Sequence, residues 1–339
     1  MSKIWLVDIE PIESRYTYYW RTHLPKMLAT RCDAEVVVVS GDVGDVKTTE
    51  GAFLNFGATN VYKSQQAIKL SQAFIDGDVQ AGDVIVFADA WNPVVIMARY
   101  MIDLLGVDVK IASIWHAGSY DYHDFLGKFA DVNWSFNAER AMFYAAHANF
   151  FATDFHVNMF CSALGVSKYD VSITRTGLPF EYIKDVCYTG PKEDIVCFPH
   201  RLADEKNYEL FKAVAAKLPQ YKFIACQEVE LSKAEYYDLL SRSKVLFSAN
   251  KQETLGIGTF EGMASGAIPV VPNRLCYPEM YGSHYLYYGD TVEEIAAAVV
   301  DKMERYDCRL SHLKADCDEV GKKFFSGDAM YAVIKRFLN

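Results

Sequence analysis

The sequence lacks the features of several common classes of protein. Lys and Arg number 34 against 44 Asp and Glu, a net charge of −10, so no overall positive field attracts a nucleic-acid backbone. No run approaches the roughly 18 apolar residues of a membrane-spanning helix. The opening stretch, Met1–Glu13, lacks the charged, apolar and small-residue regions of a signal peptide. We therefore expect a cytoplasmic protein, in the host cytoplasm if it is viral, with no membrane span.

Paired cysteines are also missing. The eight cysteines are scattered and form no C-x-x-C motif, a pattern typical of reduced thiols in a reducing compartment. What the sequence does have is the composition of a globular protein, 51% hydrophobic and 23% charged residues. Its 339 residues are too many for one ordinary core and suit two domains.

Short apolar runs alternate with segments of helical period along the whole chain. This alternation predicts an α/β fold with two doubly wound, Rossmann-like domains whose strand ends face a shared cleft. The expected strands are Lys3–Ile9, Glu35–Ser40, Asp83–Asp89, Lys110–His116, Asn149–Thr153, Asp170–Thr174, Asp194–Phe198, Lys222–Ala225, Lys244–Ser248, Ile268–Pro272 and Tyr285–Tyr288. The expected helices are Thr22–Thr30, Lys63–Asp76, Pro93–Leu105, Asn137–Ala146, Phe155–Leu164, Asn207–Leu218, Lys233–Ser241, Thr259–Ala264 and Thr291–Arg305.

A short polar stretch, Cys187–Glu193, contains adjacent Gly and Pro and is the candidate linker. It separates an expected N-terminal domain (residues 1–188) from an expected C-terminal domain (189–322). We expect a last helix, within 323–339, to pack back on the N-terminal domain.

The most informative stretch is Ser248–Pro272, SANKQETLGIGTFEGMASGAIPVVP. A strand ends there, a glycine-containing loop follows, and a helix is expected to begin near Thr259. Amide groups at a helix start, together with the helix dipole, form an anion site. Glu253 precedes this helix, and Glu261 is expected in its first turn. Carboxylates accept hydrogen bonds from vicinal sugar hydroxyls. The alternative is an ordinary β–loop–α unit with chance glutamates.

A second cluster, HRLADEKN, spans His200–Asn207 between an expected strand and an expected helix. Arg201 and Lys206 offer a bidentate cation and a point charge, the groups that grip a diphosphate. The alternative is a solvated charged turn that caps a helix.

Together the two clusters resemble family-four glycosyltransferases, which have the GT-B fold, an E-x7-E motif and a G-R-x-x-x-E-K-G signature. The resemblance implies that Glu253 contacts the transferred sugar, that Glu261 contacts the donor ribose, and that both cations hold the diphosphate. The helix tip would be formed by Gly256, Ile257, Gly258 and Thr259. His200 and Asn207 depart from the two glycines of the signature.

The same resemblance is weaker in the N-terminal half. Related enzymes often carry a histidine where His116 ends an expected strand, pointing at the transferred sugar or its leaving group; the alternative is a structural residue. The resemblance implies that the N-terminal domain binds the acceptor and the C-terminal domain binds the sugar nucleotide. Asp89, which ends another expected strand, and Asp121 are therefore candidate acceptor contacts. Glu10–Arg15 replaces the family's glycine-rich turn, which argues against the usual phosphate contact there.

One segment is basic, although the chain as a whole is acidic. Ser14–Arg31 carries four cations and no acid, interleaved with aromatic residues. Aromatic rings stack on bases while cations meet phosphates, so Arg15, Tyr16 and Trp20 are candidate acceptor contacts. The opening residues are similar to bacteriophage-encoded glycosyltransferases, some of which modify hydroxymethylated pyrimidines in DNA, by way of an accessible or flipped base. The alternative is an amphipathic helix with a snorkelling basic face.

The resemblance also sets the expected chemistry. It implies transfer with retention of configuration from a nucleotide-diphosphate sugar, UDP-glucose by default, with no required cofactor. His and Asp residues near Asp121 are within chelating spacing, but GT-B enzymes generally need no bound metal, and we predict none. Three alternatives stay open: a transferase for carbohydrate or lipid acceptors, a sugar-nucleotide 2-epimerase, and an inactive sugar-nucleotide-binding module.

Overall fold

The computed structural model describes residues 2–42, 44, 47, 49, 54–128, 133–229 and 231–339. They form two compact units. Unit 1 comprises residues 1–152, 156–179 and 327–339, and unit 2 comprises residues 153–155 and 180–326. In the described part of the chain, no helix has both the length and the apolar character needed to cross a membrane.

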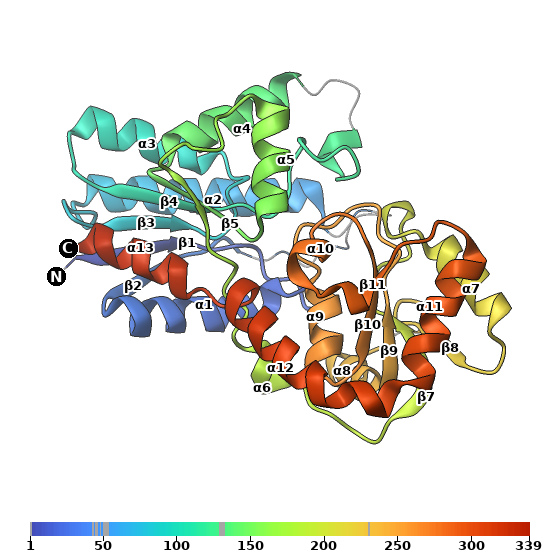
Figure 1. Ribbon diagram of the computed structural model, residues 1–339. Helices are drawn as coiled ribbons and strands as arrows, with labels where there is room; N and C mark the ends of the chain where they lie inside the picture. Colours follow the sequence, from blue (N-terminus) through green and yellow to red (C-terminus); the bar gives the residue numbers. More distant parts are fainter. Residues whose placement is uncertain are drawn as a thin grey trace. The chain divides into compact units, whose positions relative to one another are not determined.

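Unit 1 is built on a parallel sheet of six strands in the order β2-β1-β3-β4-β5-β6 (Figure 1). The strands are β1 (Lys3–Val7), β2 (Glu35–Val39), β3 (Val84–Phe87), β4 (Lys110–Ile114), β5 (Ala148–Phe151) and β6 (Ile173–Arg175). The central strand β3 is buried along its whole length, which explains its uninterrupted apolar sequence, VIVF. The strand order reverses between β1 and β3, and α/β sheets bind ligands at the carboxyl ends of strands beside such a reversal.

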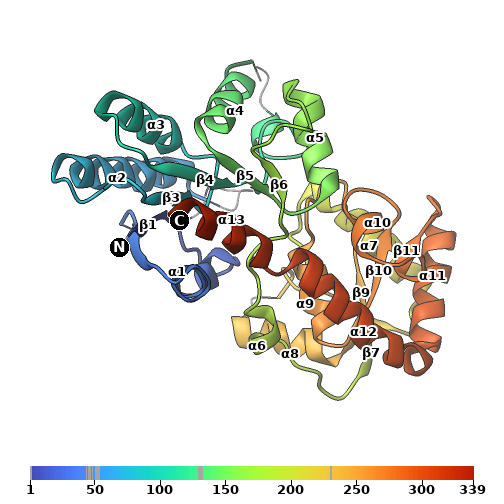
Figure 2. The same cartoon turned by 60° about the vertical axis from the view of Figure 1, so that its left-hand side comes forward.

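Helices cover both faces of this sheet. They are α1 (Thr17–Cys32), α2 (Phe56–Ile75), α3 (Val94–Leu105), α4 (Asn133–Ala145), α5 (Asp154–Leu164) and α13 (Asp328–Leu338), with the short η1 (Leu126–Lys128). Figures 1 and 2 show α13 beside α1 on one face, and α2, α3 and α4 on the other. Arg31 and Asp328 form an ion pair of 3.5 Å between α1 and α13.

Unit 2 repeats the same plan with a parallel sheet of five strands in the order β11-β10-β9-β7-β8. The strands are β7 (Glu193–Phe198), β8 (Lys222–Ala225), β9 (Ser243–Phe247), β10 (Ile268–Pro272) and β11 (Leu286–Tyr287). The order reverses between β7 and β9. The loops that follow these two strands, residues 199–206 and 248–256, therefore emerge at the ligand-binding position of the sheet.

The helices of unit 2 also form two layers. They are α6 (Ile183–Val186), η2 (Asp204–Lys206), α7 (Tyr208–Lys217), α8 (Lys233–Arg242), α9 (Ile257–Ala264), α10 (Tyr277–Met280), η3 (Ser283–Tyr285), α11 (Val292–Glu304) and α12 (Tyr306–Phe324). α7 packs beside α11, and α8 and α12 pack beside α9 (Figure 2).

Several element boundaries differ from those that the sequence predicted. α1 begins at Thr17 rather than Thr22, because Trp20 and Leu24 are buried at helical spacing and extend its packed face. The main segment of unit 2 begins at residue 180, ahead of the candidate linker Cys187–Glu193. The ring of Phe180 packs against that of Phe325, 6.1 Å away within unit 2.

Candidate functional site

The loops after β7 and β9 contact each other in unit 2. The Lys251 amide donates a hydrogen bond of 2.8 Å to the Glu205 carbonyl oxygen, which ties the two loops together. Because parallel neighbouring strands end at the same edge of the sheet, residues some 50 positions apart in sequence meet here. Both clusters that the sequence analysis singled out lie on these loops.

An ion pair joins the two loops. Lys206 Nζ lies 3.2 Å from Glu253 Oε2 and donates a 2.8 Å hydrogen bond to the Gln252 carbonyl oxygen. The Lys206 side chain is 10% exposed and that of Glu253 is 18% exposed. Burial costs each charge its hydration, so each depends on its partner. The structure thus brings together two of the residues predicted for the donor site.

Further donors surround the Glu253 carboxylate. The Thr254 amide donates to Oε1 over 3.1 Å, and Asn250 Nδ2 donates to Oε2 over 3.2 Å. Burial by itself raises the pKa of Glu253, but the Lys206 ammonium and the surrounding donors outweigh it and hold the pKa at about 2. Glu253 is therefore a carboxylate, able to accept hydrogen bonds, at any pH near neutrality.

Arg201 is held by a different acid. Its guanidinium donates to Glu205 Oε1 over 2.9 Å, and its side chain is 36% exposed while that of Glu205 is 8% exposed. Arg201 is thus held by a buried carboxylate while its own side chain stays partly exposed. Its guanidinium carries five donors in a fixed fork, the geometry that suits phosphate groups.

The tip of α9 lies beside the ion pair. Gly256 precedes it in the left-handed conformation, with φ 72°, which a residue without Cβ adopts at little cost. A Cβ on Gly258 would lie 3.4 Å from Pro199 Cβ, so the first turn of α9 packs closely on the loop after β7. The first amide groups of a helix have no partner within it and carry partial positive charge. An anion site at this helix tip stays a prediction.

Glu261 lies in the second turn of α9, not in the first turn as predicted, because the helix begins at Ile257 rather than at Thr259. Its two carboxylate oxygens accept hydrogen bonds from Tyr236 (2.8 Å) and Tyr237 (3.0 Å), both on α8. Burial raises the pKa of Glu261, and the two hydroxyl groups act against this rise. Each oxygen retains a further acceptor position.

Four residues that the sequence analysis did not assign to the site contact it. Arg274 donates to the carbonyl oxygens of Ala249 and Asn250, each over 3.0 Å. Tyr277 Oη lies 2.8 Å from Ser248 Oγ and accepts from Asn250 Nδ2 over 3.1 Å. The tyrosines of α8 complete the set. No spacing in the sequence links these residues to the E-x7-E stretch, since they reach it from other elements.

In unit 1, His116 follows β4 and is bonded on both ring nitrogens. Nδ1 lies 3.1 Å from Tyr16 Oη, and Nε2 lies 2.7 Å from the Ala88 carbonyl oxygen. A carbonyl oxygen only accepts, so Nε2 carries the proton and the Tyr16 hydroxyl donates to Nδ1. Burial lowers the pKa of His116, although Asp89 and the Ala88 carbonyl oppose the shift. The ring is therefore neutral near pH 7.

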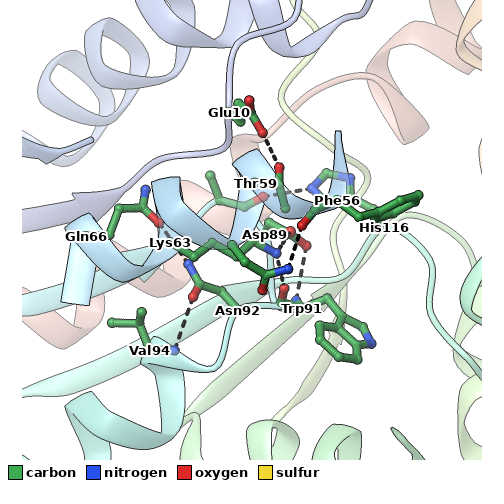
Figure 3. Close-up of polar contacts among 12 residues, drawn as sticks. Glu10, Phe56, Thr59, Lys63, Gln66, Asp89, Trp91, Asn92, Val94 and His116 are labelled. Atoms are coloured by element: carbon green, nitrogen blue, oxygen red, sulfur yellow. Dashed lines mark hydrogen bonds and ion pairs between the residues drawn. The ribbon is translucent and has the colours of Figure 1, made fainter. Parts of the chain in front are cut away.

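Asp89 follows β3 at the neighbouring strand end (Figure 3). Lys63 of α2 donates to Asp89 Oδ2 over 3.1 Å and also to the Trp91 carbonyl oxygen, while the Trp91 amide donates to Oδ1 over 3.1 Å. Burial raises the pKa of Asp89, but the nearby Lys63 ammonium outweighs this effect and keeps the pKa below its ordinary value. Lys63 is a member of this cluster that the sequence analysis missed.

The remaining predicted residues of unit 1 lie on nearby turns and on α1. Asp121 is buried and accepts from the His123 amide over 3.0 Å. The described residues contain no group of three or more His, Cys, Asp or Glu placed to hold a metal ion. The Arg15 guanidinium lies 5.4 Å from the ring centre of Tyr16. Trp20 is 2% exposed and packs 5.3 Å from His116, so its ring is engaged inside unit 1.

Comparison with known proteins shows which fold the chain shares with solved structures. No family model matches the chain. Sucrose-phosphate synthase from Thermosynechococcus elongatus is similar with a TM-score of 0.69 and 14% identity, over 100% of this chain and 99% of that chain. The starch synthase IV catalytic domain from Arabidopsis thaliana, bound to ADP and acarbose, has a TM-score of 0.66 and 10% identity, over 100% of this chain and 99% of that chain. HepE from Anabaena, in complex with UDP and glucose, has a TM-score of 0.63 and 12% identity, over 99% of this chain and 98% of that chain. The predicted fold class, two parallel α/β domains of GT-B type, is confirmed.

Proposed function

We propose that this chain is a glycosyltransferase that takes a sugar from a nucleotide-diphosphate donor. The observation that carries the proposal is the buried Lys206–Glu253 pair beside the glycine-lined tip of α9. It lies where the strand order of the second sheet reverses, the position at which such sheets bind ligands. Structures with the same fold hold UDP with glucose, or ADP.

The donor would be held by groups of complementary charge. Lys206, Arg201 and the amides of Ile257, Gly258 and Thr259 would neutralise the diphosphate. Glu253 would accept hydrogen bonds from hydroxyls of the transferred sugar, and Glu261 from the ribose. The contacts support this division, because Glu253 pairs with Lys206 whereas Glu261 is oriented by the tyrosines of α8.

The proposed reaction retains configuration. The bond between the anomeric carbon and the diphosphate oxygen breaks, and the bond to the acceptor oxygen forms on the same face of the sugar. The proton of the acceptor hydroxyl passes to the leaving diphosphate. The protein stabilises the negative charge that grows on that diphosphate, a task for preorganised cations and amides. His116 would hydrogen-bond the transferred sugar or its leaving group by exchanging one of its present partners, Tyr16 or the Ala88 carbonyl oxygen.

For the donor we propose UDP-glucose, and for the acceptor a hydroxymethylated pyrimidine in DNA. The first turns of α1 support the acceptor through their cations: Arg21 and Lys26 are exposed, as is the ring of Tyr18. Because Trp20 is buried, Tyr18 replaces it as the ring available for stacking on a base. We further propose that the protein acts in the cytoplasm, that of the host if it is viral.

One experiment separates the proposal from its alternatives. The protein is incubated with labelled UDP-glucose or ADP-glucose, either alone, with hydroxymethylated DNA, or with a carbohydrate or lipid acceptor. Labelled DNA, free nucleotide and epimeric sugar are then quantified. Labelled DNA supports the proposal in full. Nucleotide release that depends on a carbohydrate or lipid acceptor instead keeps the transferase and replaces the acceptor. An epimeric sugar would point to an isomerase, and no turnover of any donor would remove the proposed activity. Lys251→Ala is the matched control for variants of Lys206 and Arg201. It removes a cation from the same loops, one that pairs with exposed Asp204.

A further inference from the structure

His200 stands where the signature of the resembling family has a glycine. It is the second residue after β7, between Pro199, which packs on the tip of α9, and Arg201. Its side chain is 8% exposed, and its ring lies edge-on to Phe198 with centroids 5.0 Å apart. A glycine would leave this space to the ligand, so a buried imidazole here changes what the site presents to an anion.

The imidazole carries a polar atom without a partner. Among the described residues, Nε2 of His200 is buried and has no hydrogen-bond partner, and the same holds for Oδ1 of Asn250 on the facing loop. Buried polar atoms are nearly always bonded, so a buried ring nitrogen without a partner is a candidate for a hydrogen bond to a ligand. Asn250 donates to Glu253 through its other atom, and the charges of Lys206 and Glu253 both act on His200, so both residues lie close to the Lys206–Glu253 pair.

We propose that His200 is a donor-binding residue that takes up a proton as the diphosphate binds and donates Nε2–H to a phosphate oxygen. The inference rests on the proposed function and deepens it. The proton comes from solvent and is returned when the nucleotide leaves. Glu253 does not take up this proton, because its pKa is held at about 2.

The charges that face His200 explain why the proton arrives only with the ligand. They are Lys206 on η2, Arg201 on its own loop and Glu253 on the facing loop. Burial, followed by repulsion from Lys206, lowers the pKa of His200 to about 3, so the ring is neutral in the free protein. A bound diphosphate brings negative charge that reverses this balance and raises the pKa in the complex. Donor affinity therefore increases as pH falls through and below the pKa of the complex.

The test is calorimetry of sugar-nucleotide binding in two buffers that differ in ionisation enthalpy. UDP-glucose and ADP-glucose are the probes, because their diphosphate groups do not titrate near neutral pH. At about pH 6 the wild-type protein should take up a substantial fraction of one proton, and at about pH 8 less. His200→Gln keeps a donor of similar reach but cannot titrate. It should take up fewer protons, bind about tenfold more weakly at pH 6, and lose the pH dependence of affinity.

The controls distinguish a failure of the proposed role of His200 from a failure of the glycosyltransferase proposal. His284→Asn, a change at an exposed histidine of unit 2 paired with Asp316, should leave both affinity and proton uptake as in wild type. Equal proton uptake by wild type and His200→Gln would overturn the role of His200 and leave the glycosyltransferase proposal standing. Absence of binding by either probe to the wild type would overturn both. If His200→Gln fails to fold, absence of proton uptake by the wild type alone still refutes the inference.

Discussion

The two polar regions of the molecule are assembled in opposite ways. In unit 2, the Lys206–Glu253 pair joins two short loops at one edge of the sheet, and the amides of α9 face the same place. In unit 1, polar groups are matched by side chains from distant segments, such as Tyr16 with His116 and Lys63 with Asp89. Both regions lie at the ends of parallel strands beside a reversal of strand order.

This difference separates two kinds of site. The cations of unit 2 are paired with carboxylates that a ligand anion and its sugar hydroxyls can share, which suits a region that binds and stabilises charge. The unit 1 cluster is already satisfied and neutral overall, which suits a region that positions groups through fixed hydrogen bonds. Variants in unit 2 should therefore change rate and charge-dependent properties most, and variants in unit 1 should cause smaller changes.

The largest effect is expected from loss of either diphosphate cation. Lys206→Ala and Arg201→Ala should each lower kcat by about 100-fold or more, because each removes one preorganised charge that stabilises the leaving group. Lys206→Ala also leaves Glu253 buried without its cation, so it should lower the free energy of unfolding as well. Rates are measured with saturating labelled donor, and Lys251→Ala provides the control. Near-normal rates in both cation variants would refute this assignment.

The second effect concerns stability against pH. The pKa of Glu253 is about 2 in the folded protein against an ordinary value of 4.5. A depressed pKa contributes stability that is complete above about pH 4.5 and is lost as pH falls towards 2. Glu253→Gln should therefore lower the free energy of unfolding by about 2 kcal/mol at neutral pH, and the difference from wild type should shrink in acid.

Urea denaturation at neutral pH and at about pH 3 measures this difference. Glu293→Gln is the matched control, because Glu293 is an exposed carboxylate in an ion pair with Lys217. Its effect should be much smaller. The free energies of unfolding of wild type and Glu253→Gln could instead differ by the same amount at both pH values. That result would show that the Lys206–Glu253 pair does not stabilise unit 2.

The third effect tests the unit 1 cluster. His116→Gln should lower kcat about tenfold, since it replaces a ring fixed on both nitrogens by a flexible amide. Tyr16→Phe removes only the hydrogen bond to Nδ1 and should lower kcat a few-fold. It should not raise the pKa of His116, because burial is the main cause of the shift in that pKa. His147→Gln, a change on another element of unit 1, is the control. If Tyr16→Phe were as damaging as Lys206→Ala, the contrast between the two regions would fail.

The same contrast explains what the sequence could predict. Every strand of both sheets was predicted, because buried parallel strands are continuous apolar runs. The Lys206–Glu253 region was predicted because its residues lie within a few positions of strand ends, where local spacing decides their place. The two glutamates were predicted as a pair, whereas the tyrosines that hold Glu261 were not.

What the sequence could not predict depends on which helices pack side by side. Tyr236 reaches Glu261 because α8 lies beside α9, and Lys63 reaches Asp89 because α2 covers the end of β3. These contacts are decided by packing between elements, for which the single sequence has no periodic signal. Trp20 shows the same limit: its position in an aromatic and basic run suggested a ligand contact, whereas its burial makes it part of the core.

The smallest effect is expected on the exposed basic face of α1. Arg21→Ala and Lys26→Ala should each weaken binding of hydroxymethylated DNA two- to threefold, and each should reduce the slope of log affinity against log salt by about 1, because each removes one phosphate contact. Binding is measured by fluorescence anisotropy over a series of salt concentrations. Lys212→Ala, at an exposed cation of unit 2 paired with Glu209, should leave the slope unchanged. Equal slopes for all three variants and the wild type would separate α1 from the acceptor and leave unit 1 without a nucleic-acid surface on that helix.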